Sequence, residues 1–341
     1  MPDNQTDFFG DNIDLFCCPK CSGDLLRSGT GLKCRSCGRD YPIEKNIPRL
    51  FWPNEWDPGK EDVTEKIKEF YEETPFPDYD EFDNVGSLIE KSRQGIFAKL
   101  LDDQIPFGAR VLECGCGTGQ LTNFLSVSNR TVMGTDICIN SLTMAQNFKE
   151  QNDLNHAHFI QMNLFRPCFQ SHGFDLVICN GVLHHTSDPR QGFMSLSRLV
   201  KPRGYILVGL YHRYGRIYTD IRRFLFRVSR DRLKFLDRRT MNKNISQAKR
   251  KAWFNDQYKN PHESKHTIGE VLVWVKEAGF SFVKSIPKAV PFEGFRESEK
   301  LFKPDSPGNP LTRFLVESSK ILTGSGEGGF FIVIARKDSQ S

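Results

Sequence analysis

Long apolar runs are missing from this sequence of 341 residues. The most hydrophobic stretch near its middle, residues 205–211 (YILVGLY), is far shorter than the ~20 residues that a membrane-spanning helix needs. The segment MPDNQTDFFGDNIDLF is acidic and lacks the basic, apolar and small-residue pattern of a secretion signal. Internal repeats and long low-complexity segments are also absent. These absences predict a soluble, cytoplasmic protein without a transmembrane segment.

Tyrosine and tryptophan are scarce beside phenylalanine, with 8 Tyr and 4 Trp against 28 Phe. Hydrophobic residues make up 38% and charged residues 26%, which allows a packed core and argues against disorder. The length fits two domains or one large elaborated domain. We divide the chain into residues 1–50, rich in cysteine and turns, residues 51–86, rich in proline, aromatics and acids, and residues 87–341, where a β/α alternation begins.

The ten cysteines are unevenly spread, since five lie within residues 17–37 and five are scattered singly through apolar segments. This distribution suits a reducing compartment and one metal site better than a disulfide scaffold. Two C-x2-C pairs, separated by twelve residues, would present four thiolates to one tetrahedral Zn²⁺: Cys18, Cys21, Cys34 and Cys37. Four thiolates leave no open coordination position, so the predicted zinc is structural. Cys17 is a spare, and its use with Cys21 is the less regular alternative.

Short apolar stretches alternate with helical patterns from residue 87 onward. The expected strands cover residues 109–114, 131–135, 158–162, 174–179, 205–210, 280–286 and 330–335. The expected helices cover residues 87–103, 120–127, 141–151, 189–200 and 267–278. This alternation predicts an α/β fold whose parallel sheet is covered on both faces. Such sheets bind ligands beyond the carboxyl ends of their strands.

A glycine cluster, VLECGCGTGQL, follows the first of these strands. Gly115, Gly117 and Gly119 let the main chain turn tightly and approach a ligand, and the next helix offers unpaired N–H groups. Asp136 ends the second strand, where a carboxylate can accept both hydroxyls of a ribose. The spacing G-x-G-x-G differs from the dinucleotide fingerprint G-x-G-x-x-G, because the third glycine comes one residue early. A nicotinamide-dependent oxidoreductase is therefore the disfavoured alternative.

In these residues the chain resembles the class I S-adenosylmethionine-dependent methyltransferases, in the branch that includes quinone-type enzymes. The resemblance lies in five segments: VLECGCGTG, GTDI, HFIQMNLF, FDLVICNGVLHH and LVKPRGYILVGLY. It covers about residues 87–211 and the last helix and two strands. It implies a Rossmann-like sheet of seven strands with helices on both faces. It also implies in-line SN2 methyl transfer from S-adenosyl-L-methionine to an unidentified acceptor, which is a small molecule, a lipid or RNA.

The resemblance assigns roles around the cofactor. Glu113 and the loop formed by Gly115, Cys116, Gly117 and Gly119 would hold the methionine part. Asp136 would take the ribose hydroxyls, and Ile137 would pack on the adenine. Asn163 stands where Asp commonly bonds the adenine amino group, and its amide oxygen can accept the same bond. Asn180 would line the path to the methyl group.

Two adjacent histidines follow the fourth expected strand. His184 and His185 are candidate general bases, needed only if the acceptor must lose a proton. A histidine has an unperturbed pKa near ~6.5, which suits this role. The alternatives are that one or both only line the substrate site, cap the following helix or pack against the sheet.

The cysteine-rich segment CPKCSGDLLRSGTGLKCRSCGRDYPIEKNIPRLF also resembles a known family. It is similar to the small zinc ribbon of tRNA-methyltransferase activator proteins and to the one at the start of some bacterial rRNA methyltransferases. This resemblance favours RNA as a partner. Alternatively, the zinc ribbon only stabilises the fold, or it serves as a docking surface.

Residues 70–79 (FYEETPFPDY) are dense in aromatics and prolines. Prolines fix the path of such a segment, and Tyr71 and Tyr79 would close over the cofactor and exclude water. The alternative is a linker that packs on the sheet edge.

Charge is concentrated in residues 201–266, where 18 Lys/Arg face 5 Asp/Glu, a local +13; since the whole chain carries +5, the rest carries −8. The stretch that begins at Arg216 and ends at Arg239 has apolar residues on one helical face and arginines on the other. Three interpretations of this stretch are open. They are a charged outer face on a helix that covers the substrate, a phosphate-binding surface for RNA, and a helix on a membrane surface.

Two insertions, at about residues 212–266 and 289–325, are expected to shape the substrate side. Tyr211, His212 and the polar segment 256–266 are expected near the mouth of the site. A non-catalytic cofactor-binding or RNA-binding module on the same fold is the alternative function, and the intact glycine loop and Asp136 argue against it.

Overall fold

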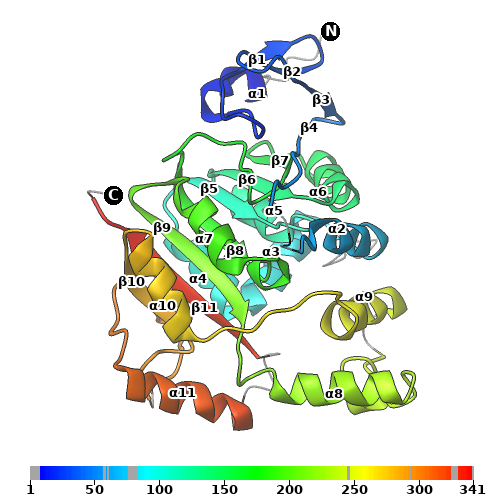
Figure 1. Cartoon of the computed structure of the whole chain (residues 1–341), viewed down its shortest axis with the longest axis vertical. Coiled ribbons are helices and arrows are strands. Elements are labelled where there is room, and N and C mark those ends of the chain that lie inside the picture. The colour runs from blue at the N-terminus through cyan, green and yellow to red at the C-terminus, as the bar shows by residue number, and fades with distance from the viewer. Residues whose placement is uncertain are drawn as a thin grey trace.

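The computed structural model describes residues 8–56, 59, 61–75, 83–243, 246–291, 293–323 and 329–339. A central sheet with helices on both faces runs through the molecule (Figure 1). Its core has seven strands, which neighbour one another in the order β7-β6-β5-β8-β9-β11-β10. Their bounds are β5 Arg110–Cys114, β6 Thr131–Asp136, β7 Ala157–Met162, β8 Phe174–Asn180, β9 Val200–Tyr211, β10 Phe280–Ile286 and β11 Phe330–Lys337. All seven predicted strands are therefore present.

The direction of the last strand differs from the predicted parallel sheet. Strands β7, β6, β5, β8 and β9 are mutually parallel. Strand β11 lies antiparallel between β9 and β10. Phe330 at its start pairs with Tyr211 at the end of β9, so the chain enters β11 from the carboxyl end of β9. Since β10 and β11 are antiparallel neighbours, the chain turns back after β10, and the second insertion lies in this connection.

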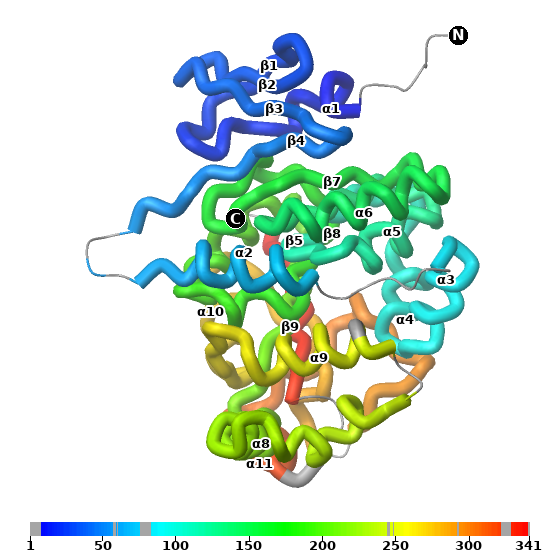
Figure 2. Tube along the Cα trace, turned by 90° about the vertical axis from the view of Figure 1, so that its right-hand side faces the viewer, coloured from blue at the N-terminus to red at the C-terminus, as the bar shows by residue number. Residues whose placement is uncertain are grey.

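Four short N-terminal strands extend the sheet: β1 Leu25–Ser28, β2 Gly31–Cys34, β3 Asp40–Glu44 and β4 Ile47–Leu50. They pair antiparallel in sequence order. Strand β4 then pairs parallel with β7, through Arg49 with Gln161 and Leu50 with Met162, which gives eleven strands in all. Figure 2 shows these strands at one end of the molecule, with α1 (Phe8–Asp11) beside them.

Alternate residues of the central strands bury their side chains in two different layers. Leu112 belongs to a core with α7 (Pro189–Ser197) and α10 (Ile268–Glu277), whereas Val111 belongs to a core on the opposite face. That second face is covered by α3 Val85–Gln94, α4 Ile96–Gln104, α5 Gln120–Ser126 and α6 Ile139–Gln151. The single helix predicted over residues 87–103 is two helices, because Gly95 adopts an extended conformation (φ −86°, ψ 116°) between them.

The remaining helices lie in the N-terminal unit (η1), in the linker (α2), directly after β8 (η2) and in the two insertions (α8, η3, α9 and α11). They are η1 Ile13–Leu15, α2 Thr64–Glu73, η2 Leu183–His185, α8 Ile217–Val228, η3 Lys234–Leu236, α9 Gln247–Tyr258 and α11 Pro310–Thr323. Figure 1 places α8 and α11 beyond the arrowhead of β9, with α9 above α8. None of the helices in the described ranges combines the length and apolar character needed to cross a membrane.

Candidate functional site

The loop between β5 and α5 is held in a conformation that only glycine adopts readily. Gly115, Gly117 and Gly119 have φ values of 71°, 52° and 74°. The N–H groups of Gly115 and Cys116 both donate to the carbonyl of Thr135, at 2.7 and 3.0 Å. A Cβ on Gly115 would lie 2.2 Å from Val182 Cγ2, so a side chain is excluded there by contact as well as by φ.

Asp136 at the end of β6 is tied to this loop. Its Oδ2 accepts from the N–H of Gly117 at 2.9 Å, and its Oδ1 accepts from the N–H of Cys138 at 2.9 Å. Burial raises the pKa of the Asp136 carboxyl, and the main-chain donors oppose that shift. A carboxylate has about four lone-pair sites, so some acceptor capacity remains for a ligand.

Glu113 lies at the end of β5 with only 7% of its surface exposed. Thr122 Oγ1 donates to Glu113 Oε2 at 2.5 Å. Burial raises the pKa of Glu113 to about 7, and the bonds from Thr122 oppose that effect.

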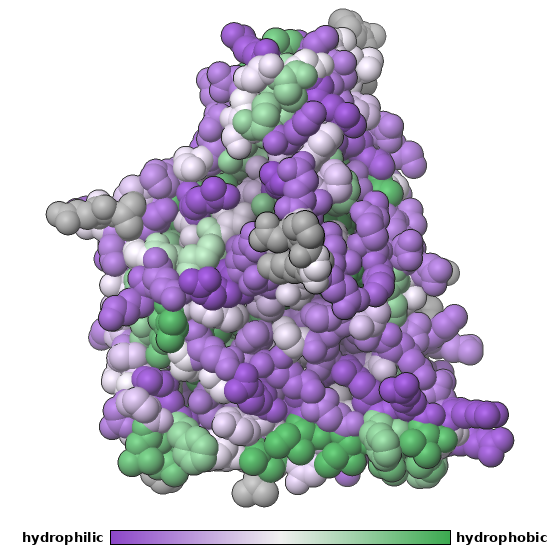
Figure 3. Space-filling model, viewed as in Figure 1, coloured by the Kyte–Doolittle hydropathy of each residue, from purple (hydrophilic) through white to green (hydrophobic). Residues whose placement is uncertain are grey.

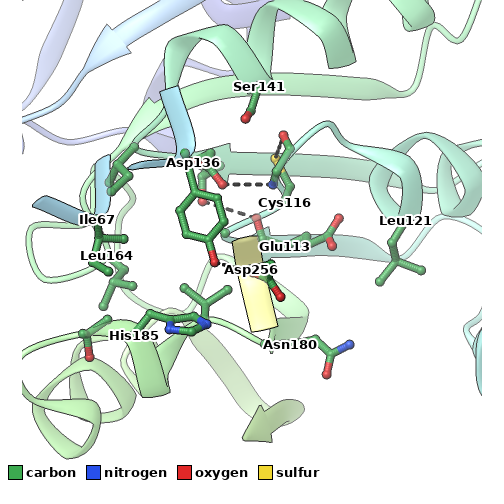
Figure 4. Close-up of a pocket in the computed structure, with 18 of the residues that line it drawn as sticks. Ile67, Glu113, Cys116, Leu121, Asp136, Ser141, Leu164, Asn180, His185 and Asp256 are labelled. Atoms are coloured by element: carbon green, nitrogen blue, oxygen red, sulfur yellow. Dashed lines mark hydrogen bonds between the residues drawn. The ribbon is translucent and has the colours of Figure 1, made fainter. Parts of the chain in front are cut away.

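These residues line one cavity of about 580 Å³, a volume typical of ligand sites. Figure 4 shows Glu113, Cys116 and Asp136 on one side, with His185 and Asn180 on the other. Of the predicted cofactor contacts, the cavity brings together Glu113, Gly115, Cys116, Gly117, Asp136, Ile137, Asn163 and Asn180. Gly119 lies outside the lining, because its Cα faces Ala145 and Phe159, and a Cβ there would lie 2.6 Å from the Ala145 Cβ.

The two asparagines at the strand ends have different surroundings. Asn163 Nδ2 donates to the carbonyl of Trp52 at 3.0 Å and to Asn54 Oδ1 at 2.7 Å, while its Oδ1 accepts from the N–H of Phe165 at 3.0 Å. Its oxygen keeps one lone pair for a further donor. Asn180 is exposed to the cavity and lies over Gly209, where a Cβ would be 1.9 Å from Asn180 Oδ1.

The opposite wall is built by α2 and the first insertion. Tyr71 Oη donates to Asp256 Oδ1 at 2.8 Å. Gln257 Nε2 donates both to Asp256 Oδ2 at 2.9 Å and to Tyr211 Oη at 3.0 Å. Burial first, and then Asp256, raises the pKa of Tyr71 far above its ordinary value. Tyr71 and Tyr211 line the cavity, whereas Tyr79 lies outside the described residues.

The two adjacent histidines occupy different environments. His185 lines the cavity, and its Nδ1 lies 2.8 Å from the carbonyl of His262. Since a carbonyl only accepts, Nδ1 carries the proton and Nε2 is the basic nitrogen of the neutral ring. Burial lowers the pKa of His185, which keeps the ring neutral at pH 7.

His184 and His212 are absent from the cavity lining. His184 is fully buried, and its ring lies 3.9 Å, centroid to centroid, from the Tyr211 ring at an angle of 35°. His212 is 1% exposed, accepts at Nδ1 from the N–H of Gly215 at 3.1 Å, and places Nε2 3.4 Å from Glu317. The geometry therefore favours packing against the sheet for His184 and places His212 beside Glu317 of α11.

Sequence reasoning missed several residues of the cavity. The apolar lining includes Ile67, Leu121, Phe165, Trp253 and Phe330, which come from five separate segments. Of the polar segment 256–266, the cavity includes Asp256 and Gln257. Trp253, Asp256 and Gln257 reach the cavity through long-range packing of the first insertion, which no local spacing marks. Leu121, in contrast, directly follows the glycine loop in the sequence.

Two arginines, Arg216 just before α8 and Arg223 within it, point into the protein, whereas Arg227 of the same helix is exposed. Arg216 is fully buried, and its guanidinium lies 3.7 Å from the centre of the Tyr211 ring. Glu263 accepts from Arg216 Nη2 at 2.8 Å and from Arg223 Nη2 at 2.5 Å. These arginines brace the wall of the cavity, so the expected outward orientation is wrong for Arg216 and Arg223.

The four predicted zinc ligands lie together. The Sγ atoms of Cys18, Cys21, Cys34 and Cys37 are all within 4.8 Å of one another. Among the described residues they form the one such cluster, and Cys17 is outside it with its Sγ 3.8 Å from the carbonyl of Pro167. Ser22 and Gly38, just after each pair, have φ values of 59° and 69°, which turn the chain tightly. Four thiolates in this arrangement fit a tetrahedral structural zinc.

Comparisons with known proteins agree with this fold. An uncharacterized protein of Synechococcus sp. is 25% identical over 200 residues, which cover 51% of this chain and 48% of that protein. The ubiquinone biosynthesis O-methyltransferase of Glaesserella parasuis is 29% identical over 119 residues, which cover 34% of this chain and 50% of that enzyme. This chain thus spans about half the length of these curated relatives.

A solved structure has the same fold. PKMT2 from Rickettsia typhi, in complex with AdoHcy, superposes with a TM-score of 0.51 at 14% identity, over 77% of this chain and 55% of that chain. Residues 112–208, from β5 to β9, match a family described as methyltransferase domain. This part of the chain is therefore similar to the methyltransferase domain family.

Proposed function

We propose that the protein transfers a methyl group from S-adenosyl-L-methionine to an acceptor that enters the same cavity. The observation that carries this proposal is the single cavity in which the glycine loop, Asp136 and Asn180 face His185. The family match supports the reaction class. The proposed organisation is a zinc ribbon in residues 1–50, a linker in residues 51–86 and the methyltransferase domain with its insertions in residues 87–341.

The residues present fit the cofactor. The loop at Gly115 leaves a main-chain cradle that a Cβ could enter only by displacing Val182. Asp136 would accept the ribose hydroxyls, Ile137 would pack on the adenine, and Asn163 Oδ1 would accept from its amino group. Glu113 and the loop of Gly115, Cys116 and Gly117 would hold the methionine part. When bound, the cofactor supplies an electrophilic methyl group on a sulfonium.

The chain's own contribution is orientation, exclusion of water and acceptance of a proton. Tyr71 and Tyr211 close the wall opposite Asp136, and their hydroxyls are held by Asp256 and Gln257. His185 Nε2 is the proposed base for a protic acceptor, because Nδ1 is committed to His262 and the ring is neutral. Fixing acceptor and donor in line supplies much of the rate enhancement in such transfers.

Calorimetric titration of the full chain with S-adenosyl-L-methionine and with S-adenosylhomocysteine tests cofactor binding. We expect one site per chain. Binding of a nicotinamide dinucleotide in place of these ligands would overturn the proposal in favour of an oxidoreductase.

Methyl transfer itself can be tested with the labelled methyl donor and fractionated cell extract. We expect label in one class of acceptor. The variant His185→Asn should bind the cofactor normally and lose at least ~100-fold in transfer, the lower range for a general base. Cofactor binding by the wild type with no transfer to any fraction would support the non-catalytic binding module instead.

A further inference from the structure

Helix α8 exposes its apolar side to solvent. Ile221, Phe224 and Val228 are 50%, 65% and 67% exposed. They recur at three- and four-residue intervals, so they form one stripe along the helix. A surface helix of a globular protein normally turns such a stripe toward the core.

The inward side of α8 explains this orientation. Arg216 and Arg223 point inward and share the carboxylate of Glu263, whose side chain is 2% exposed. Breaking a buried ion pair of this kind is strongly unfavourable, so the helix cannot rotate to bury its apolar stripe without losing it. The exposure of the stripe is therefore fixed by the fold.

Helix α11 repeats the arrangement. Its Glu317 is 6% exposed and accepts from the N–H of Ile268 at 2.5 Å. Leu311, Phe314 and Leu315 face outward, at 66%, 53% and 52% exposure. A polar anchor points inward and an apolar face points outward, as in α8.

The two apolar faces form one surface. Phe314 of α11 contacts Tyr214, just before α8, with ring centroids 6.4 Å apart. Figure 3 shows apolar side chains gathered along the edge of the molecule that carries α11 and α8. We call this surface the α8–α11 platform: Ile221, Phe224, Val228, Leu311, Phe314 and Leu315.

Basic side chains flank the platform. Arg227, Arg230, Arg232 and Arg238 are all exposed in and just after α8. The acids of the same stretch have internal partners, since Asp231 pairs with Lys259 at 2.8 Å and Asp237 accepts from Tyr258 Oη at 2.6 Å. The outer charge next to the apolar stripe is therefore positive.

We propose that the α8–α11 platform docks this protein on the surface of an anionic lipid bilayer, with both helices lying in the plane of the interface. An apolar stripe beside arginines is the pattern of interfacial helices on anionic lipids. Nucleic acid would use the arginines and leave the apolar stripe in water. A second copy would bring the same positive rim against this one. The proposal makes no use of methyl transfer.

Flotation of the full chain with vesicles tests it. We expect binding to vesicles of phosphatidylcholine and phosphatidylglycerol in equal parts, and weaker binding to phosphatidylcholine alone. The double variant F224E/F314E should lower the partition coefficient at least ~tenfold. Phe107→Glu is the matched control, since Phe107 is 77% exposed in the turn before β5 and should leave binding unchanged.

A separate variant tests the contribution of the exposed arginines to vesicle binding. R227Q/R230Q/R232Q should weaken binding to the mixed vesicles by about fivefold per residue and leave binding to phosphatidylcholine unchanged. Equal flotation of wild type and F224E/F314E would overturn the proposal. So would a wild-type dimer that F224E/F314E separates, or binding of RNA by a wild type that does not float.

Failure of docking and failure of the proposed function are distinguishable. F224E/F314E should keep wild-type affinity for S-adenosyl-L-methionine in calorimetry, which also shows that it folds. Asp136→Ala should float with vesicles as the wild type does.

Discussion

Asp136 joins two turns of the main chain by accepting from Gly117 N at 2.9 Å and from Cys138 N at 2.9 Å. The same carboxylate faces the cavity, so it both shapes the glycine loop and offers oxygens to a ligand. Structure and proposed binding are therefore coupled at one residue.

Asp136→Ala should weaken both properties. We expect at least a ~tenfold rise in the Kd for S-adenosyl-L-methionine and a loss of about 1–3 kcal/mol in the free energy of unfolding, because two main-chain donors lose their acceptor. Calorimetry and urea unfolding measure the two effects. Asp175→Ala is the control, since Asp175 accepts from Arg110 N at 2.9 Å but is absent from the cavity lining; a change in cofactor affinity there would contradict this account.

Two glycines with similar positive φ values allow the stability cost of backbone strain to be separated from the cost of a steric clash. Gly115 and Gly181 have φ values of 71° and 85°, but only Gly115 has atoms within 4 Å of an added Cβ. Gly115→Ala should therefore cost about 1–3 kcal/mol more stability than Gly181→Ala and should lower cofactor affinity. Equal unfolding free energies for the two variants would show that Val182 yields at little cost.

The sequence predicts the parts of the site that depend on local spacing. The glycine loop, Asp136 and the four cysteines are recognisable because each follows or precedes an element at a fixed offset. Asp256 and Trp253 reach the cavity only because α9 packs across it, and the direction of α8 depends on Glu263, forty residues after Arg223. The amphipathic pattern of α8 was visible, but its side facing the core was decided by that buried ion pair.

Removal of one zinc ligand should unfold the N-terminal unit. Cys34→Ser leaves three thiolates, and we expect loss of the bound zinc, measured by metal analysis, together with loss of protection of β1 to β3 from proteolysis. Cys17→Ser is the matched control, because Cys17 is buried but its Sγ lies outside the cluster. Zinc retained at one per chain in Cys34→Ser would contradict a four-cysteine site.

His158 gives the fold a dependence on pH. It lies on β7, 7% exposed, with its ring stacked on Phe8 at 3.3 Å between centroids. Burial first, and then the charge of Lys149, lowers its pKa to about 3. Between that value and the ordinary pKa of about 6.5, the unfolded chain binds a proton that the folded chain does not, so stability is complete above pH 6.5 and declines as the pH falls.

His158→Gln removes this contribution to the pH dependence of the free energy of unfolding. In the variant the free energy of unfolding should fall less steeply between pH 6 and pH 4, by up to about 1.4 kcal/mol per pH unit, because one proton no longer distinguishes the two states. Urea unfolding at a series of pH values measures the slope. His172→Gln, at an exposed position, is the control and should keep the wild-type slope. Parallel curves for wild type and His158→Gln would show that His158 takes up its proton in the folded protein as readily as in the unfolded one.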